Sequence, residues 1–255
     1  MDALLQVKQL NKVYGQGEQK FHALKDVSFT IEQGEFVGVM GSSGAGKSTL
    51  LNLLATIDTP TSGDIFIAGT NIAKMNGDEL ADFRRDNLGF IFQDYNLLDS
   101  LTVRENILLP LAIAKKPAAV IAKKVDEIAA LFGIDALLNK YPYQISGGQK
   151  QRTAASRALV TEPKLIFADE PTGALDSKSA TDLLNSFVRL NEQKESTIMM
   201  VTHDAYAASF CRRIVFIQDG QLATEIFKGT KTRKQFFDTI LETLAQVSGD
   251  IHDVI

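Results

Sequence analysis

Gly41-Ser42-Ser43-Gly44-Ala45-Gly46-Lys47-Ser48 is a glycine-rich segment with the spacing Gly-x-x-x-x-Gly-Lys-Ser, the pattern of a phosphate-binding loop. An apolar segment, Phe36–Met40, precedes it, and a helical pattern from Lys47 to Ala55 follows it. Glycines let such a loop turn its N–H groups toward phosphate oxygens, and the helix adds the positive end of its dipole. We therefore expect residues 41 to 49, ending at Thr49, to bind a nucleotide, with Lys47 on the β- and γ-phosphates and Ser48 on Mg²⁺.

Apolar segments alternate with helical patterns along most of the chain, which predicts an α/β fold. Continuous apolar runs such as Leu165–Ala168 and Thr197–Val201 are typical of a parallel sheet that helices cover on both faces. The early strands, within residues 4 to 31, are expected to be antiparallel. Between about residues 102 and 161 the pattern is almost wholly helical. We therefore expect a P-loop NTPase core with a mostly parallel sheet, an N-terminal antiparallel β part and an inserted α-helical subdomain.

Composition excludes several classes of protein. A formal net charge of −4 over 255 residues argues against a large basic face, so no nucleic-acid partner is expected. No stretch approaches the roughly 18 uninterrupted apolar residues of a membrane span. The single cysteine, Cys211, permits no internal disulfide and suits a reducing compartment. These observations predict a cytoplasmic globular protein.

Two carboxylates end an apolar segment in Leu165-Ile166-Phe167-Ala168-Asp169-Glu170. A buried strand holds such side chains at its carboxyl end, where ligands bind in open α/β sheets. Asp169 fits a Mg²⁺ ligand that acts through water, and Glu170 fits the group that polarises an attacking water. An Asp-Glu pair alone is more often a solvated turn, so the interpretation depends on the phosphate-binding loop.

The segment Ile145-Ser146-Gly147-Gly148-Gln149-Lys150-Gln151-Arg152 resembles the signature sequence of ABC-transporter ATPases, usually written LSGGQ, with Ile145 in place of leucine. Its physical basis is a second anion site at the start of a helix. In that family the signature faces the γ-phosphate bound by a second subunit. The resemblance therefore implies a head-to-tail dimer of two copies that sandwiches ATP, with Ser146, Gly147, Gly148 and Gln149 binding ATP in trans.

Other elements of the ABC ATPase pattern follow in order. Tyr14 resembles the aromatic residue that stacks on adenine, and Gln93 resembles the glutamine that touches Mg²⁺ and signals to the membrane partner. Gly173-Ala174-Leu175-Asp176 is similar to the loop written SALD, so Asp176 is expected to contact the second subunit. His203 matches the histidine that contacts the γ-phosphate.

The resemblance covers residues 4 to about 226 and implies an ATP hydrolase that uses ATP and Mg²⁺. The catalytic residues would be Glu170, His203, Gln93 and Lys47, with Mg²⁺ held by Ser48, Gln93 and, through water, Asp169. We expect an ABC ATPase domain over residues 1 to 227 and a C-terminal amphipathic tail over residues 228 to 255. The tail helix carries Phe236, Phe237, Ile240, Leu241 and Leu244 on one side; it could dock on its own domain or contact a partner.

Longer segments resemble one branch of the family, which includes macrolide exporters, lipoprotein-releasing ATPases and the FtsE division ATPase. FIFQDYNLLD (Phe90–Asp99), ENILLPL (Glu105–Leu111) and RKQFFDT (Arg233–Thr239) resemble most the BceA-type ATPases of bacitracin and lantibiotic resistance. That resemblance implies an integral membrane permease of about ten spans, a sensor histidine kinase, and a place on the inner face of the membrane in a Gram-positive bacterium. Related macrolide-export, lipoprotein-release or division complexes, or a soluble ABC ATPase, remain alternatives.

The permease is expected to dock beside Gln93, in a groove between the core and the helical subdomain. The alternative for the residues of this groove is ordinary packing between the two parts of the chain. Candidate contacts are Asp94, Tyr95, Leu97, Leu98 and Leu101.

Overall fold

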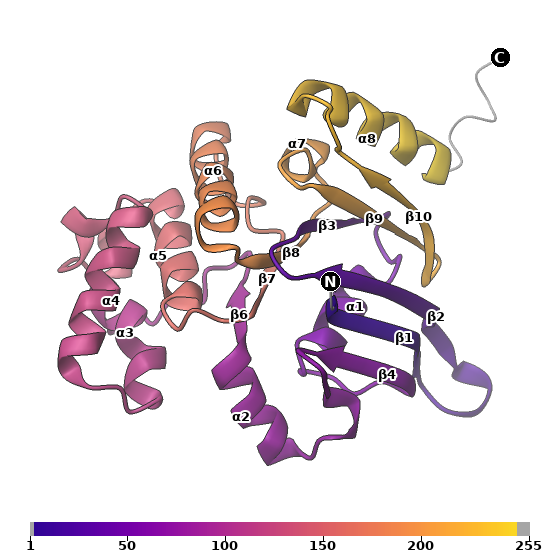
Figure 1. Cartoon of the computed structure of the whole chain (residues 1–255), viewed down its shortest axis with the longest axis horizontal. Helices are drawn as coiled ribbons and strands as arrows, with labels where there is room; N and C mark the ends of the chain where they lie inside the picture. Colours follow the sequence, from indigo (N-terminus) through magenta and orange to yellow (C-terminus); the bar gives the residue numbers. More distant parts are fainter. Residues whose placement is uncertain (1–2, 249–255) are drawn as a thin grey trace.

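A computed structural model describes residues 3–248 and contains two β-sheets with helices packed around them (Figure 1). The first sheet is antiparallel in the strand order β2-β1-β4-β5. Along β2, Val27, Phe29 and Ile31 are buried while Ser28 and Thr30 are exposed, so one face packs on the core and the other meets solvent. The expected antiparallel N-terminal part is confirmed. Its strands are β1 (Ala3–Tyr14), β2 (Phe21–Glu32), β4 (Ser62–Ile67) and β5 (Thr70–Asn71).

The second sheet has six strands in the order β10-β9-β3-β8-β7-β6, and every neighbouring pair is parallel except β10 with β9. The predicted mostly parallel sheet is therefore confirmed. Its strands are β3 (Phe36–Met40), β6 (Leu88–Ile91), β7 (Leu165–Asp169), β8 (Thr197–Val201), β9 (Arg213–Gln218) and β10 (Gln221–Phe227).

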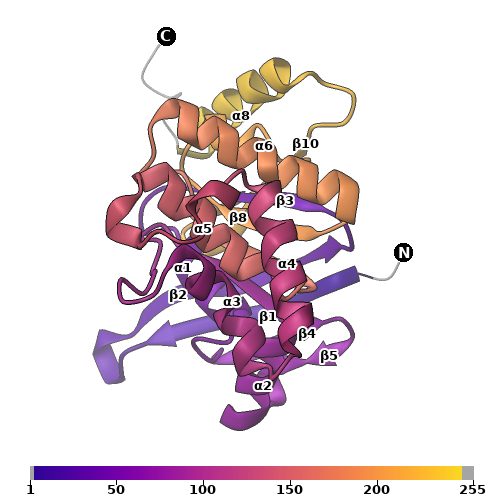
Figure 2. The ribbon, with the colours of Figure 1, turned by 90° about the vertical axis from the view of Figure 1, so that its left-hand side faces the viewer.

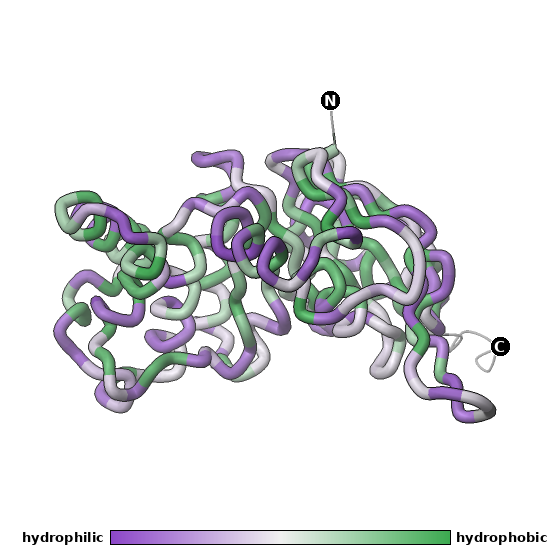
Figure 3. Tube along the Cα trace, turned by 90° about the horizontal axis from the view of Figure 1, so that it is seen from below, coloured by the Kyte–Doolittle hydropathy of each residue, from purple (hydrophilic) through white to green (hydrophobic). Residues whose placement is uncertain are grey.

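Both faces of the parallel sheet are buried, and side chains alternate between two hydrophobic clusters. On β8, Ile198 and Met200 belong to the cluster shared with α6, whereas Met199 and Val201 belong to the cluster shared with α1 and the antiparallel sheet. This alternation follows from the two-residue period of a strand. The parallel sheet is thus the middle layer, and apolar segments run through both lobes of the molecule (Figure 3).

The helical lobe lies beside the edge strand β6 and contains α3, α4 and α5. Helices α6, α7 and α8 lie over the face of the parallel sheet that is turned away from the antiparallel sheet (Figures 1 and 2). Short 3-10 turns connect several elements. The α-helices are α1 (Lys47–Leu54), α2 (Gly77–Asn87), α3 (Val103–Ile113), α4 (Ala118–Leu131), α5 (Gly147–Leu159), α6 (Ser177–Lys194), α7 (Ala205–Ala208) and α8 (Arg233–Ser248). Within residues 3–248 no helix is long and apolar enough to span a bilayer.

The tail helix α8 packs on its own domain through one narrow face. Phe236 and Ile240 are completely buried in the cluster around α6 and α7, and Phe237 and Leu244 are partly buried against it. Leu241 lies at the margin of this apolar side, four residues after Phe237, and is 45% exposed. The expected tail beyond residue 248 lies outside the described residues.

Helix α2 and strand β10 are the longest of the elements that the sequence did not predict; the short β5 and α7 are others. Helix α2 has no fully buried residue. Only Leu80 and Phe83 pack against the core, and both are partly buried, so the apolar pattern of this helix is short. It begins with a capping box between Asn76 and Glu79. Strand β10 forms an edge and is only partly buried. Asp219 and Gly220, with φ of +49° and +78°, join it to β9, and an Asp-Gly pair between two strands is a hairpin signal that was available in the sequence.

Candidate functional site

The carboxyl ends of four neighbouring parallel strands carry the expected site residues. In the order β3-β8-β7-β6, these strands lead into the glycine-rich loop, the Thr202-His203 segment, the Asp169-Glu170 pair and the Gln93 segment. Parallel strands end at one edge of their sheet, and ligands of open α/β sheets bind at that edge. Four segments distant in sequence therefore meet at one place.

The glycine-rich loop packs tightly against β9, the turn after it and strand β2 of the antiparallel sheet. Gly46 has a φ of +103°, and a Cβ there would lie 2.6 Å from the carbonyl oxygen of Ala23, so only glycine fits before α1. Lys47 Nζ donates to the carbonyl oxygens of Gly41 and Ser42 at 2.8 Å each. Burial lowers the pKa of Lys47, and the charges of Glu170 and Asp169 oppose that shift.

Asp169 and Glu170 place two carboxylates beside Lys47. Burial raises the pKa of Asp169 above its ordinary value, the neighbouring charge of Glu170 adds to the rise, and Lys47 opposes it. Glu170 has a φ of +45°, an unusual conformation for a residue with this side chain. Its N–H donates to the carbonyl oxygen of Val201 at 2.9 Å, which anchors this backbone position between β7 and β8. Strained backbone of this kind is concentrated at functional sites.

The carboxylate of Glu170 is fixed by the segment after β8. Its Oε1 lies 2.8 Å from His203 Nδ1 and accepts a hydrogen bond from the His203 backbone N–H at 3.0 Å. Its Oε2 accepts from the hydroxyl of Thr202 at 3.3 Å. Thr202 is fully buried and was missed in the sequence, where its position at the end of an apolar strand beside His203 was the available signal. Glu170 and His203 are therefore brought together, with His203 73% exposed at its side chain.

Gln93 is exposed after β6 and lies against the segment that follows Glu170. A Cβ on Gly173 would be 3.1 Å from Gln93 Nε2, so the two groups are neighbours. The hydroxyl of Ser48, the amide oxygen of Gln93 and the carboxylate of Asp169 are hard oxygen donors of the kind that Mg²⁺ prefers. In the part of the chain that the structure describes, no group of three His, Cys, Asp or Glu could hold a metal, so Mg²⁺ would need phosphate oxygens to complete its ligands.

Tyr14 is held firmly at the end of β1, near the start of α1. Its hydroxyl donates to Asp58 Oδ2 at 2.8 Å, and Lys12 Nζ lies 4.7 Å from the ring centroid. Burial and the Asp58 contact raise the pKa of Tyr14, while a hydrogen bond with Thr49 lowers it. Tyr14 is 40% exposed, and its ring thus lies accessible beside the phosphate-binding loop.

The signature residues cap α5. Ser146 N donates to Gln149 Oε1 at 2.9 Å, and Gln149 N donates to Ser146 Oγ at 3.4 Å. A Cβ on Gly148 would lie 2.5 Å from Ser179 Oγ, so glycine is required for α5 to approach α6. None of the hydrogen bonds from residues 146 to 149 reaches the phosphate-binding loop of the same chain within residues 3–248. In Figure 1, α5 lies in the helical lobe and α1 lies beside β1, so the two anion sites are on different parts of one chain.

Asp176 caps α6 beside the signature. Its Oδ1 accepts from the N–H groups of Lys178 and Ser179 at 3.0 Å each, and its Oδ2 accepts from Ser179 Oγ at 2.7 Å. These hydrogen bonds, led by that from Ser179, hold the pKa of Asp176 below its usual range. The signature and Asp176 therefore form one surface at the adjoining starts of α5 and α6.

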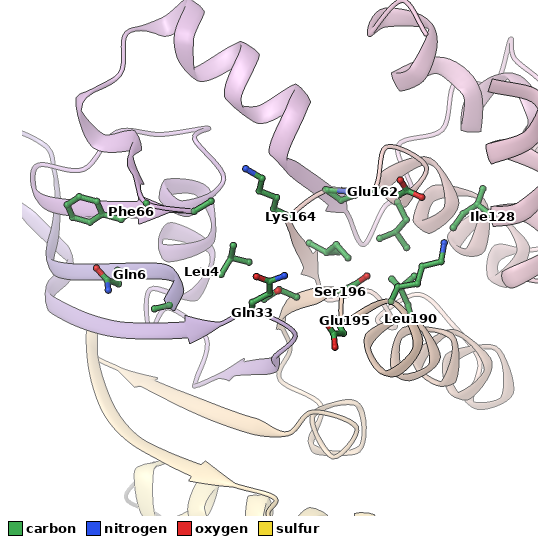
Figure 4. A pocket seen from close by; sticks show the side chains of 18 residues that line it. Leu4, Gln6, Gln33, Phe66, Ile128, Glu162, Lys164, Leu190, Glu195 and Ser196 are labelled. Carbon is green, nitrogen blue, oxygen red and sulfur yellow. The ribbon is translucent and has the colours of Figure 1, made fainter. Parts of the chain in front are cut away.

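A separate cavity of about 940 Å³ lies near the other end of the parallel strands (Figure 4). Lys164 and Ser196, which immediately precede β7 and β8, line it together with Leu4 of β1 and Ile128 of α4. None of the expected nucleotide-binding or catalytic residues lines it. It is therefore distinct from the site at the carboxyl edge.

The ABC transporter family model matches residues 24–173. The ABC transporter ATP-binding protein YxdL of Bacillus subtilis is 50% identical over 254 residues, covering all of this chain and 98% of that protein. The bacitracin export ATP-binding protein BceA of Halalkalibacterium halodurans is 51% identical over 251 residues, covering 98% of this chain and 99% of the relative. Both similarities extend through most or all of α8.

Two further similarities cover less of this chain. The macrolide export ATP-binding/permease protein MacB of Aggregatibacter actinomycetemcomitans is 42% identical over 225 residues, which are 88% of this chain but 35% of that protein. The solved dimeric post-hydrolysis state of the ATP-binding cassette MJ0796, bound to ADP and Pi, is 40% identical with a TM-score of 0.80 and covers 88% of this chain and 98% of that one.

Proposed function

This chain belongs to the ABC transporter family as an ATP-binding and ATP-hydrolysing subunit, and we propose that Glu170 orients the water that attacks the γ-phosphate. The support is the contact of its carboxylate with His203 and Thr202 at the edge of the sheet that carries the phosphate-binding loop. Lys47 and His203 would stabilise the charge that develops on the transferred phosphoryl group. Gln93 would contact Mg²⁺ and signal the state of the site to the membrane partner. Mg²⁺, held with the nucleotide by Ser48, Gln93 and water on Asp169, supplies charge neutralisation when bound.

The nucleotide itself would be bound by the loop and by the ring of Tyr14 on adenine. The rigid anchoring of Tyr14 by Asp58 and Lys12 supports this role, because a pre-oriented ring loses little entropy on binding. The proposed binding residues in the loop are Gly41, Ser42, Ser43, Gly44, Ala45, Gly46, Lys47, Ser48 and Thr49.

We propose that two copies complete each ATP site head to tail. The signature residues Ser146, Gly147, Gly148 and Gln149, with Asp176 beside them, would reach the γ-phosphate bound by the other copy. Two observations support this arrangement: the separation of the signature from the phosphate-binding loop within one chain, and the dimeric state of the similar cassette MJ0796. A helix start that offers free N–H groups is suited to a phosphate group.

The proposed task is to power a membrane permease that protects against bacitracin or related antimicrobial peptides. Similarity to the bacitracin export ATPase BceA over 98% of this chain is the observation that carries this proposal. A permease of about ten spans, a sensor histidine kinase acting through it, and a position on the inner face of a Gram-positive membrane complete the proposal. Macrolide export is the second candidate, because MacB is 42% identical over 88% of this chain.

The permease would dock on the segment that follows Gln93. Leu98 is 46% exposed there, and Arg157 of α5 donates to the carbonyl oxygens of Tyr95 and Asn96. Arg157 thus links this segment to the signature helix α5 by hydrogen bonds. Through that link, docking of the permease and binding of ATP would influence each other. The proposed contacts are Asp94, Tyr95, Leu97, Leu98 and Leu101.

The test is to isolate the Glu170→Gln variant with ATP from native membranes and to identify the membrane protein that co-purifies with it. The variant should bind ATP as the native protein does and hydrolyse it at least about a hundredfold more slowly, since it lacks the carboxylate that orients water. Recovery of a permease of about ten spans with one large extracellular domain supports the peptide-resistance proposal. A four-span partner favours macrolide export or its relatives, and reproducible absence of a membrane partner contradicts a transport role.

A further inference from the structure

One buried amide connects the signature helix to both catalytic loops. Gln151 lies on α5, two residues beyond the signature, and its side chain is fully buried. Its Nε2 donates to the carbonyl oxygen of Phe92 at 3.0 Å and to the carbonyl oxygen of Pro171 at 2.9 Å. A glutamine amide supplies two donors from one nitrogen, and Gln151 uses both on the main chain of other segments.

The two accepting residues adjoin the two proposed catalytic groups. Phe92 immediately precedes Gln93, and Pro171 immediately follows Glu170. Both lie where the neighbouring strands β6 and β7 have ended and their chains leave the sheet. The amide of Gln151 therefore holds the loops of Gln93 and Glu170 at a set distance from each other and from α5.

The oxygen of the same amide indicates that the two hydrogen bonds donated by Nε2 determine the conformation of the Gln151 side chain. Among the described residues, Gln151 Oε1 is buried and has no hydrogen-bond partner, which is unfavourable in a protein interior. The rotamer is thus held in spite of an unpaired acceptor. Ser156, on the same helix and equally buried, instead donates to the carbonyl oxygen of Arg152 within α5.

We propose that Gln151 is a positioning residue that transmits movement of the signature helix to Gln93 and Glu170. Its two hydrogen bonds make the start of α5 and both catalytic loops move as one unit. When the signature engages ATP on the other copy, α5 carries the two loops with it and sets them for hydrolysis. This inference rests on the proposed roles of Gln93 and Glu170.

The test compares Gln151→Leu and Gln151→Met with Ser156→Ala in steady-state ATP hydrolysis. Both Gln151 variants keep most of the buried volume and remove the donors. We expect kcat to fall about tenfold or more, because misplaced catalytic groups lose rate steeply. The KM for ATP and the affinity for ATP should stay within about twofold of the native values, because the phosphate-binding loop is untouched. Ser156→Ala should leave kcat unchanged.

Hydrogen exchange separates positioning from general stability. In the Gln151 variants, amides around Gln93 and Gly173 should exchange faster while those of α1 and β3 keep their native rates. Native kcat in both folded variants overturns the proposal, as does a fall in kcat that Ser156→Ala reproduces. If Gln151→Leu does not fold, Gln151→Met decides by the same criteria. Failure of Glu170→Gln to slow hydrolysis would instead refute the proposed role of Glu170, independently of Gln151.

Discussion

At the scale of single residues, the site combines a strained backbone with opposed charges. Glu170 adopts a φ of +45° and is kept there by a main-chain hydrogen bond to Val201 and by the side-chain contacts to His203 and Thr202. Burial raises the pKa of the neighbouring Asp169, the charge of Glu170 adds to the rise, and Lys47 opposes it. Such arrangements lower stability and are retained where the chemistry needs them.

Asp169→Asn should therefore stabilise the nucleotide-free protein while impairing hydrolysis. The pKa of Asp169 is raised in the folded chain by burial and by Glu170, so the folded chain binds this proton more tightly than the unfolded chain. The ionised carboxylate destabilises the fold above the raised pKa, and the penalty disappears as the pH falls below the ordinary pKa of an aspartic acid. We expect Tm to rise by about 2 °C at neutral pH and the gain to vanish in acid.

Thermal unfolding at several pH values measures this effect, with the exposed Asp238→Asn as the control. A pH-independent gain, or an equal gain in the control, would show that the charge of Asp169 is not responsible.

The residues with motif spacing were predictable, and those that support them were not. Lys47, Glu170 and His203 stand in short patterns at the ends of apolar segments. Thr202 donates one hydrogen bond to a distant segment and Gln151 donates two. The position of Thr202 beside His203 was a signal, but no periodicity or spacing states which segment either side chain will contact.

At the scale of elements, the burial of a strand or helix determines how clearly its hydrophobic pattern predicts it. Strands β3, β7 and β8 are buried on both faces and appear as continuous apolar runs, so they were predicted with nearly their observed bounds. Helix α2 contacts the core only through the partly buried Leu80 and Phe83, and so short an apolar face gives a weak periodic signal. The tail helix left two interpretations, because an amphipathic pattern does not state which surface covers its apolar face. The structure places that face against α7, within the cluster that α6 also lines.

The docking of α8 can be measured by truncating its buried face. Phe236 is completely buried, and Phe236→Ala should lower the free energy of unfolding by about 3 kcal/mol through lost burial and a cavity. Leu241→Ala, on the same helix but 45% exposed, should change it by less than about 0.5 kcal/mol. Denaturant titration of both variants gives the comparison. Equal effects, or none at Phe236, would contradict the observed orientation of the helix.

At the scale of the whole molecule, the two anion sites define two different surfaces. The phosphate-binding loop lies at the carboxyl edge of the parallel sheet, and the signature lies where α5 and α6 begin. The central claim is that one surface of each copy completes the other surface of its partner around ATP.

The most direct test is the mass of Glu170→Gln in solution, by sedimentation velocity, with and without ATP and Mg²⁺. We expect a monomer that becomes a dimer when ATP is added, because slow hydrolysis preserves the bound nucleotide. Adding Ser146→Arg should weaken dimerisation at least about tenfold while calorimetry still detects ATP on the intact phosphate-binding loop. A double variant that dimerises as well as Glu170→Gln, or a single variant that stays monomeric with ATP bound, would contradict the shared site.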